Sequence, residues 1–353
     1  MTSGCALAWH RRLVTIRRLR IYSSMNKTAF MQELNLNSIY LGDAKEVLST
    51  FPDKSIDCCV TSPPYYGLRD YDVSGQLGQE RTPEAYIENL VSVFREVRRV
   101  LRDDGTLWVN IGDSYAGGSG RWGGAKNLSY IQRTSPGSLT QIQHTKPWEH
   151  LHIKPKDLIG IPWSLAFALR ADGWFLRSDI IWQKPNPMPE SIKDRCTKAH
   201  EYIFMLSKRQ KYYFDIDSIR EPHTSLDDFN RRIRNGKEEW KTVKAGADSP
   251  YSMRGTGKSR RTMYHPLGRG KRTVWTVPLM KSKDAHFATY PEKLIVDCIK
   301  AGCPAGGVVL DPFIGSGTTA VVARKEGRRY VGIELNPEYI GIAERRIKKV
   351  IVE

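Results

Sequence analysis

The residues with the clearest chemical potential are Ser62, Pro63, Pro64 and Tyr65, which follow the apolar run 56–60. The run predicts a short buried strand, and the paired prolines end it and hold the next carbonyls in an extended loop. A hydroxyl, a rigid carbonyl and an aromatic face then lie at the carboxyl end of a strand, where open α/β sheets bind ligands. Such acceptors can orient an amino group on a flat ring. The alternative is a rigid surface turn without a ligand, because proline and serine are common in loops.

A second stretch favours the ligand-binding interpretation. Residues 306–310 predict a strand, residues 311–317 a glycine turn, and residues 318–323 the start of a helix. The glycines of the turn let the backbone approach a ligand closely, and the helix N-terminus favours an anionic group. This is not a phosphate-binding Walker loop, because no Gly-Lys-Ser/Thr sequence follows. Glu334, about 20 residues further on at the end of another predicted strand, can accept hydrogen bonds from ribose hydroxyls.

Both stretches carry a family resemblance. The sequences Asp311-Pro312-Phe313-Ile314-Gly315-Ser316-Gly317-Thr318-Thr319 and Ser62-Pro63-Pro64-Tyr65 closely resemble the motifs of the S-adenosylmethionine-dependent amino-group DNA methyltransferases of bacterial restriction–modification systems. The Ser-Pro-Pro-Tyr motif comes first, as in the permuted group called the beta class. The resemblance extends from Asn35 to Arg346 apart from the middle. It implies a Rossmann-like class I methyltransferase fold, which is an α/β fold with a mostly parallel twisted sheet, an antiparallel hairpin and an inserted target-recognition region.

The resemblance also implies roles for individual residues. Ser62, Pro63, Pro64 and Tyr65 are expected to act on a base flipped out of duplex DNA, with Tyr65 stacked on that base. The expected cofactor is S-adenosyl-L-methionine, and its carboxylate suits the glycine turn. The residues expected to bind it are Asp43, Thr61, His286, Asp311, Pro312, Phe313, Gly315, Ser316, Gly317, Thr318 and Glu334. Taken without the resemblance, Asp43 could only cap the following helix, and His286 could be structural.

The residue before the paired prolines bears on the target base. In the resembling family, serine is typical of enzymes that modify the 4-amino group of cytosine, whereas the adenine enzymes mostly carry Asp or Asn. Ser62 therefore favours cytosine-N4 methylation; adenine-N6 methylation and an inactive DNA-binding scaffold are the alternatives. Methylation at carbon 5 of cytosine is excluded, because it needs a cysteine nucleophile, usually in a Pro-Cys dipeptide, and Cys303-Pro304 has the reverse order.

Alternating strand and helix patterns predict the sheet that positions these motifs. Residues 39–43 and 106–111 read as strands, and residues 83–101 have apolar positions at helical spacing. Such alternation is typical of βαβ units in a mostly parallel sheet. Residues 201–206 and 211–215 predict the two strands of an antiparallel hairpin.

Composition indicates the kind of partner. The chain of 353 residues has a formal net charge of +17 and a pI of about 9.6, which favours a polyanion such as double-stranded DNA. No apolar run approaches the roughly 18 residues of a membrane-spanning helix. The six cysteines form no CxxC pair and no zinc-spaced Cys/His cluster, so no metal site is predicted. We expect a cytoplasmic protein of bacterial or phage origin.

The chain divides into predicted segments. Residues 1–24 are rich in arginine and free of acids, which predicts a leader that is unfolded or absent from the mature protein; if it is a targeting segment, an organelle or the nucleus is the alternative location. Residues 25–229 are the predicted catalytic part of the methyltransferase domain. Its Gly- and Ser-rich loop 114–149 is expected to close over DNA, or else is an insertion without function. Residues 273–353 are the predicted cofactor-binding part.

The segment 230–272 is the predicted target-recognition region. It holds thirteen Lys or Arg against three acids, which gives 13 − 3 = +10. Lysines and arginines can neutralise phosphates, and individual arginines can read guanine edges, whereas a solvated basic loop is the alternative. The expected DNA-binding residues are Arg231, Arg232, Arg254, Lys258, Arg260, Arg261, Arg269, Lys271 and Arg272. A cognate restriction endonuclease that acts separately and the oligomeric state are left open.

Overall fold

The computed structural model of the protein describes residues 34–68, 73–116, 153–154, 156–223, 265, 267–279 and 290–350. The predicted leader and most of the predicted loop 114–149 lie outside these residues. The same holds for His286 and for six of the expected DNA-binding residues: Arg231, Arg232, Arg254, Lys258, Arg260 and Arg261. No helix within the described ranges is long and apolar enough to cross a membrane.

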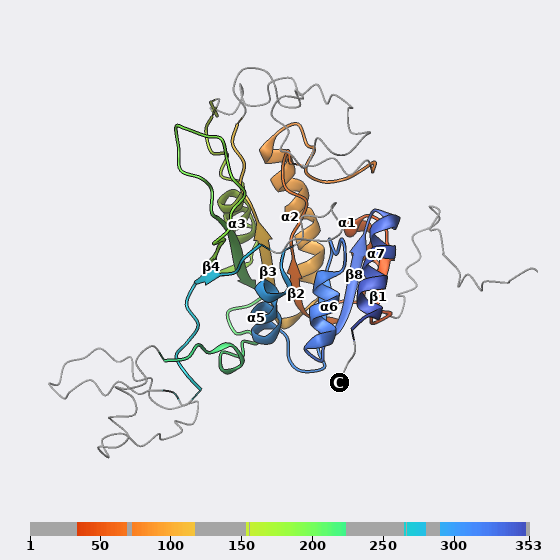
Figure 1. The fold of residues 1–353 in the computed structure, drawn as a ribbon. Helices are drawn as coiled ribbons and strands as arrows, with labels where there is room; N and C mark the ends of the chain where they lie inside the picture. Colours follow the sequence, from red (N-terminus) through yellow and green to blue (C-terminus); the bar gives the residue numbers. More distant parts are fainter. Residues whose placement is uncertain are drawn as a thin grey trace, which may run out of the picture. The chain divides into compact units, whose positions relative to one another are not determined.

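One sheet of eight strands forms the centre of the fold, in the order β1-β8-β7-β2-β3-β5-β4-β6 (Figure 1). Every neighbouring pair is parallel except the two made by β5, which lies antiparallel between β3 and β4. The predicted α/β fold with a mostly parallel sheet is therefore confirmed. The strands are β1 (Ser38–Leu41), β2 (Ile56–Thr61), β3 (Leu101–Ile111), β4 (Phe175–Gln183), β5 (His200–Ser207), β6 (Val274–Thr276), β7 (Val308–Asp311) and β8 (Arg329–Glu334).

The predicted hairpin is wrong in its second strand. Strand β5 confirms residues 201–206, but residues 211–215 form no strand. Both edges of β5 are already paired, since Ser207 lies opposite a residue of β3 on one side and of β4 on the other. Residues 211–215 instead bond elsewhere: the Tyr213 amide donates to the Asp104 carbonyl and the Asp215 amide to the Ala301 carbonyl, both at 2.9 Å.

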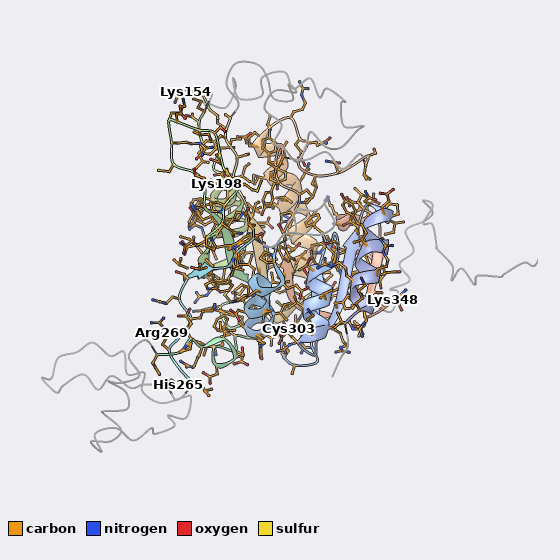
Figure 2. The ribbon with its side chains drawn as sticks, viewed as in Figure 1. Lys154, Lys198, His265, Arg269, Cys303 and Lys348 are labelled. Carbon is orange, nitrogen blue, oxygen red and sulfur yellow. The ribbon has the colours of Figure 1, made fainter. Side chains whose placement is uncertain are left out.

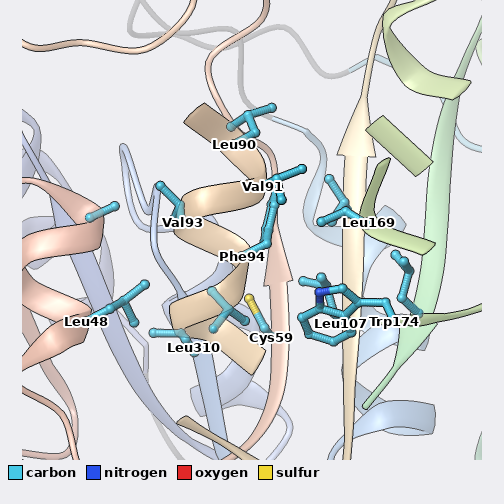
Figure 3. Packing of buried hydrophobic residues seen from close by; sticks show 14 of the residues in the cluster. Leu48, Cys59, Leu90, Val91, Val93, Phe94, Leu107, Leu169, Trp174 and Leu310 are labelled. Carbon is cyan, nitrogen blue, oxygen red and sulfur yellow. The ribbon is translucent and has the colours of Figure 1, made fainter. Parts of the chain in front are cut away.

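Helices cover both faces of the sheet (Figure 1). Because strand side chains alternate between faces, Leu107 belongs to one apolar core and Trp108 to the other. Figure 3 shows the first core, where Leu48, Phe94 and Leu169 from three helices surround strand residues such as Leu107. That core is formed with α1 (Ala44–Ser49), α2 (Pro83–Val100) and α3 (Ile161–Ala171), and the second with α5 (Glu292–Gly302), α6 (Thr318–Lys325) and α7 (Pro337–Lys348).

Helix α2 begins where the sequence predicts it to begin. The Thr82 side chain accepts a hydrogen bond from the Ala85 amide at 3.2 Å, and Pro83 occupies the first turn, where its missing N–H costs nothing. Its buried residues include Tyr86, Leu90 and Phe94, which recur at helical spacing. The helix therefore presents Tyr86 to the loop that follows β2.

The direction of the helical connections reverses between β7 and β2. Helix α6 joins β7 to β8 across one face of the sheet, whereas α2 joins β2 to β3 across the other. Strands β1, β8, β7, β2 and β3 run parallel, so their carboxyl ends lie at one edge. Ligands bind α/β sheets outside such a switch point. Both sequence motifs follow these two strands, and the fold therefore brings them together.

Candidate active site at the carboxyl edge of the sheet

A buried carboxylate joins the two motifs at the switch point. Asp311 at the end of β7 accepts a hydrogen bond from the Thr61 hydroxyl at the end of β2, at 2.6 Å, although the residues are 250 positions apart. Its other donors are the Phe313 amide at 3.0 Å, the Thr319 hydroxyl at 2.5 Å and the Tyr290 hydroxyl at 3.1 Å. Burial raises the pKa of Asp311 above its usual value, and these hydrogen bonds oppose the shift.

These contacts give Thr61 and Asp311 a positioning role. Each carboxylate oxygen of Asp311 accepts two hydrogen bonds, and the side chain is buried with Thr61. Pro312 is also buried, and Phe313 packs against the core formed with α1, α2 and α3. Direct contact of Asp311 with the cofactor stays a prediction; what the structure assigns to it is the junction of the cofactor turn with the catalytic loop.

The catalytic loop is held from several sides. The Pro64 carbonyl accepts a hydrogen bond of 2.7 Å from the Tyr86 hydroxyl of α2. Gly112 faces the Tyr65 ring so closely that an added Cβ would lie 2.7 Å from the ring. Pro63 is buried, while Ser62, Pro64 and Tyr65 are half-buried. The Pro64 carbonyl is therefore occupied by the protein, which leaves the Ser62 hydroxyl and the Pro63 carbonyl as the predicted acceptors for a ligand.

Sequence reasoning did not find the polar cluster around the Tyr65 hydroxyl. This hydroxyl lies 2.8 Å from Glu201 Oε2 and 3.2 Å from Asn110 Oδ1. Glu201 also forms an ion pair with Lys184, and both side chains are largely buried. Asn110 offered a signal, because it is a polar residue within the apolar strand 106–111. Glu201 and Lys184 had none, since only the antiparallel placement of β5 between β3 and β4 brings them to Tyr65.

The residues of the cofactor edge fit S-adenosylmethionine. Glu334 Oε2 and Oε1 each accept one backbone N–H, from Gly315 at 2.9 Å and Asn336 at 2.8 Å, so each oxygen keeps a further acceptor site. Such a carboxylate suits ribose hydroxyls. Gly315 has φ of +51°, and a Cβ built there would meet only the Phe313 carbonyl oxygen, at 4.0 Å, which leaves room for a ligand. Helix α6 begins at an N-cap, Gly317, that makes no side-chain cap hydrogen bond, so its first amides suit a carboxylate.

Asp43 lies at the same edge, since the Gly42 amide donates to the Glu334 carbonyl at 3.0 Å. Its Oδ1 accepts hydrogen bonds from the Lys45 and Glu46 amides and so caps α1, which confirms the capping alternative. Contact of Asp43 with the cofactor adenine stays a prediction. Gly317 is needed for packing as well as for the turn, because a Cβ there would lie 2.7 Å from the Ala343 Cβ.

Arg346 of α7 holds the side chains of Ser316 and Thr318. Its Nη1 donates to the Ser316 carbonyl at 2.7 Å, the Ser316 hydroxyl at 2.6 Å and the Thr318 hydroxyl at 3.1 Å. Both residues were predicted to bind the cofactor, and in the structure their side chains instead fix the glycine turn to α7. Their predicted contact with the cofactor would therefore be made through the backbone.

Replacing Arg346 by methionine is expected to raise the dissociation constant for S-adenosylmethionine about tenfold, because hydrogen bonds from a charged group to the turn are lost. Isothermal titration calorimetry would measure it. Arg345→Met removes an exposed arginine of the same helix and serves as the control. Equal dissociation constants for the two variants would contradict the role given to Arg346.

The three expected DNA-binding residues that the structure describes make internal ion pairs. Arg269 and Arg272 lie 3.1 and 3.3 Å from Glu221 Oε2, and Lys271 lies 2.7 Å from Asp297 Oδ2. The Glu221 and Arg269 backbones also exchange hydrogen bonds of 2.9 and 2.8 Å. Figure 2 labels Arg269 at this point, where the chain leaves and rejoins the described part. DNA contact by the three residues stays a prediction.

Comparison with known proteins follows from this geometry. A family model described as DNA methylase matches residues 56–345. The chain belongs to this family. It is 44% identical over 316 residues to the type II methyltransferase M.Cfr9I of Citrobacter freundii, which covers 90% of this chain and 89% of that one. It is also 44% identical over 325 residues to the type II methyltransferase M.SmaI of Serratia marcescens, which covers 89% and 92% of the two chains.

Solved structures support the fold of this DNA methylase. The PvuII DNA methyltransferase, titled cytosine-N4-specific, matches with a TM-score of 0.57 and 19% identity over 90% of this chain and 89% of that one. A DNA modification methylase of Thermus thermophilus, TTHA0409, complexed with S-adenosyl-L-methionine, matches with a TM-score of 0.52 and 24% identity over 88% and 93%. At such identities the likeness concerns the fold.

The family identifies the reaction class. The chain is a type II DNA methyltransferase of the amino-group family, its substrate is DNA, and its cofactor is S-adenosylmethionine. The resemblance of the two motifs is thereby confirmed. Within the described residues no group of His, Cys, Asp and Glu side chains could hold a metal ion.

Proposed function

We propose that this DNA methylase modifies the 4-amino group of cytosine at a specific site in duplex DNA, after the base is flipped out. The observation that carries this proposal is the Ser62 hydroxyl, which stands before the paired prolines at the switch point, beside the Tyr65 ring. The printed specificity of the PvuII enzyme supports the same target. The bacterial sources of the relatives support the expectation of a cytoplasmic enzyme.

The proposed chemistry depends on the acceptors around the amine. The nitrogen lone pair of cytosine is delocalised into the ring, and acceptors at the Ser62 hydroxyl and the Pro63 carbonyl orient the N–H bonds so that the nitrogen becomes pyramidal. The Tyr65 ring holds the base by stacking. When bound, S-adenosylmethionine supplies a methyl group on a sulfonium, and Glu334, Gly315 and the first turn of α6 would hold it. Most of the rate then comes from positioning.

The test is mass spectrometry of nucleosides from unmethylated DNA incubated with the enzyme and methyl-labelled S-adenosylmethionine. The proposal requires label in 4-methylcytosine. Label in 6-methyladenine would retain the site and replace the target by adenine. DNA and cofactor binding without label in any nucleoside would favour the inactive-scaffold alternative.

We further propose that the insertion closed by Glu221 and Arg269 recognises the DNA. The paired backbones of these residues bring the two ends of segment 222–268 together, so this segment can be regarded as a unit inserted into the catalytic domain. Gly268 supports the closure, because it has φ of +109° and a Cβ there would lie 2.2 Å from the Glu221 carbonyl oxygen. The recognition unit would thus end before Arg269, and most of the basic residues lie within it.

Replacing both Arg260 and Arg261 by alanine is expected to weaken binding of all DNA sequences and to lower the slope of log affinity against log salt by about 2, since each phosphate contact contributes about 0.9. Fluorescence anisotropy at several salt concentrations measures the slope. Arg329→Ala, which removes one arginine at the amino end of β8, should leave the slope unchanged. An unchanged slope with loss of sequence discrimination would assign the pair to base readout instead.

A further inference from the structure

The groups around the Tyr65 hydroxyl fix the direction of its hydrogen bond. Glu201 Oε2, at 2.8 Å, belongs to a carboxylate that forms an ion pair with Lys184, and an ionised carboxylate only accepts. The other neighbour is Asn110 Oδ1 at 3.2 Å. The Asn110 amide group donates to the Tyr202 backbone carbonyl at 3.1 Å and to Glu201 Oε2 at 3.3 Å, which fixes Oδ1 toward Tyr65. Tyr65 therefore donates.

The ion pair that holds Glu201 is itself enclosed. Both side chains of the Lys184–Glu201 pair are 15% exposed, and the Lys184 ammonium lies 4.4 Å from the centroid of the Trp182 ring. Trp182 is opposite Glu201 in the register of β4 and β5. Charges that are paired and buried in this way have little freedom to move away. Glu201 consequently stays in place as an acceptor facing Tyr65.

The direction of this bond passes on to Ser62. A side-chain hydrogen bond joins Ser62 to the Tyr65 oxygen. The one proton of Tyr65 is already given to Glu201, so the Ser62 hydroxyl must donate its own proton to Tyr65. Ser62 then has only lone pairs left for a ligand. A lone pair accepts from an exocyclic amino group and repels a keto oxygen at the same ring position.

We propose that Glu201 is a positioning residue that acts through Tyr65 to make the Ser62 hydroxyl an acceptor, so that the site selects an amino group over a keto oxygen. The inference rests on the proposed role of Ser62 in methyl transfer. It adds a reason for the polar cluster that stacking by Tyr65 does not need. It also explains why a tyrosine hydroxyl belongs in this position: a phenylalanine ring would stack on the base but would leave the Ser62 proton free to rotate.

A double-mutant cycle tests whether Glu201 acts through Tyr65. Tyr65→Phe keeps the ring and the Lys184–Glu201 pair, and Glu201→Gln keeps the shape of the acceptor; each is expected to lower kcat about 10²-fold by misdirecting Ser62. Because both changes break the same connection, the double variant should be about as slow as Tyr65→Phe alone. Independent losses, which multiply to about 10⁴-fold, would overturn the proposal. So would a wild-type kcat in Glu201→Gln.

The matched control is Glu96→Gln, which neutralises a partly buried glutamate in an ion pair with Arg99 on α2, far from Tyr65 in the sequence. Its kcat should equal that of the wild type. Thermal unfolding of each variant shows whether a loss of kcat comes from a loss of folded protein. A wild-type enzyme that methylates no DNA would overturn the proposed function, whereas methylation by the wild type with independent losses would overturn only the role of Glu201.

A binding experiment keeps the proposal falsifiable even if Glu201→Gln does not fold. The probes are two duplexes that carry the methylated site, mapped beforehand by sequencing, with either cytosine or uracil as the target base opposite guanine. Uracil replaces the amino group by a keto oxygen. The uracil-to-cytosine affinity ratio should rise about tenfold in Tyr65→Phe relative to the wild type, since one well-placed hydrogen-bond preference discriminates by at least this much. The easier flipping of a mismatched base cancels between the proteins, and an unchanged ratio would overturn the proposal.

Discussion

Replacing Ser62 by alanine is expected to lower kcat for methyl transfer by about 10²–10³-fold, the usual effect of removing one group that contacts the reacting centre. The dissociation constant for S-adenosylmethionine should stay within about twofold, because the cofactor edge is formed by other residues. The reason is that Ser62 supplies one of only two predicted acceptors for the target amine; the Pro64 carbonyl already bonds to Tyr86. Single-turnover kinetics with labelled cofactor would measure the rate.

Ser49→Ala is the matched control for this experiment. Its hydroxyl donates to the Glu46 carbonyl at 2.6 Å at the exposed end of α1. The control should keep the wild-type rate. A Ser62→Ala enzyme with wild-type kcat would remove Ser62 from the chemistry and would leave the cytosine proposal without its supporting observation.

Replacing Asp311 by alanine is expected to lower the free energy of unfolding by about 3 kcal/mol, because buried donors lose their acceptor. The affected donors are the hydroxyls of Thr61, Thr319 and Tyr290 and the Phe313 amide. The cofactor turn would lose its connection to β2, so affinity for S-adenosylmethionine should fall at least tenfold, or about 1.4 kcal/mol. Urea unfolding and calorimetry measure the two effects. Asp194→Ala, which removes an exposed partner of Lys156, is the control and should change stability by less than about 0.5 kcal/mol.

The stability difference should also depend on pH. Burial raises the pKa of Asp311 in the folded protein above the ordinary value of 3.8, so the folded chain binds this proton more tightly than the unfolded chain. Its contribution is therefore fully present below pH 3.8 and decreases as the pH rises through the raised pKa. Asp311→Ala lacks this dependence. The stability gap between wild type and variant should narrow from about pH 4 upwards, and a gap that widens would contradict the raised pKa.

Much of the fold follows from the sequence because its signals are local. The helix over 83–100 has a cap, a proline in its first turn and a regular apolar face, and each of these acts within a few residues. The glycine turn 315–317 likewise carries its own chemistry. The second hairpin strand was predicted wrongly because the apolar pattern of 211–215 contains no information about which edges of β5 are free.

The site was predictable only in part for a related reason. Ser62 and Tyr65 stand in a recognisable motif, and Glu334 ends a recognisable strand. The partners that fix them come from elements far away in the sequence: Glu201 from β5, Lys184 after β4, and Arg346 from α7. Residue types at those positions are ordinary for a surface, and only the strand order turns them toward the site.

The order of the sheet has a consequence for folding during synthesis. Strands β1 and β2 are made early, but β8 and β7, which lie between them in the sheet, are made after all other strands. Until then, β1 lacks the neighbour with which it pairs from Ser38 to Leu41. Such pairings between distant segments form slowly and leave apolar strand faces exposed in the meantime. The half-made chain therefore has no cofactor site and is a natural client for chaperones, and methyl transfer can begin only when the last two strands close the gap.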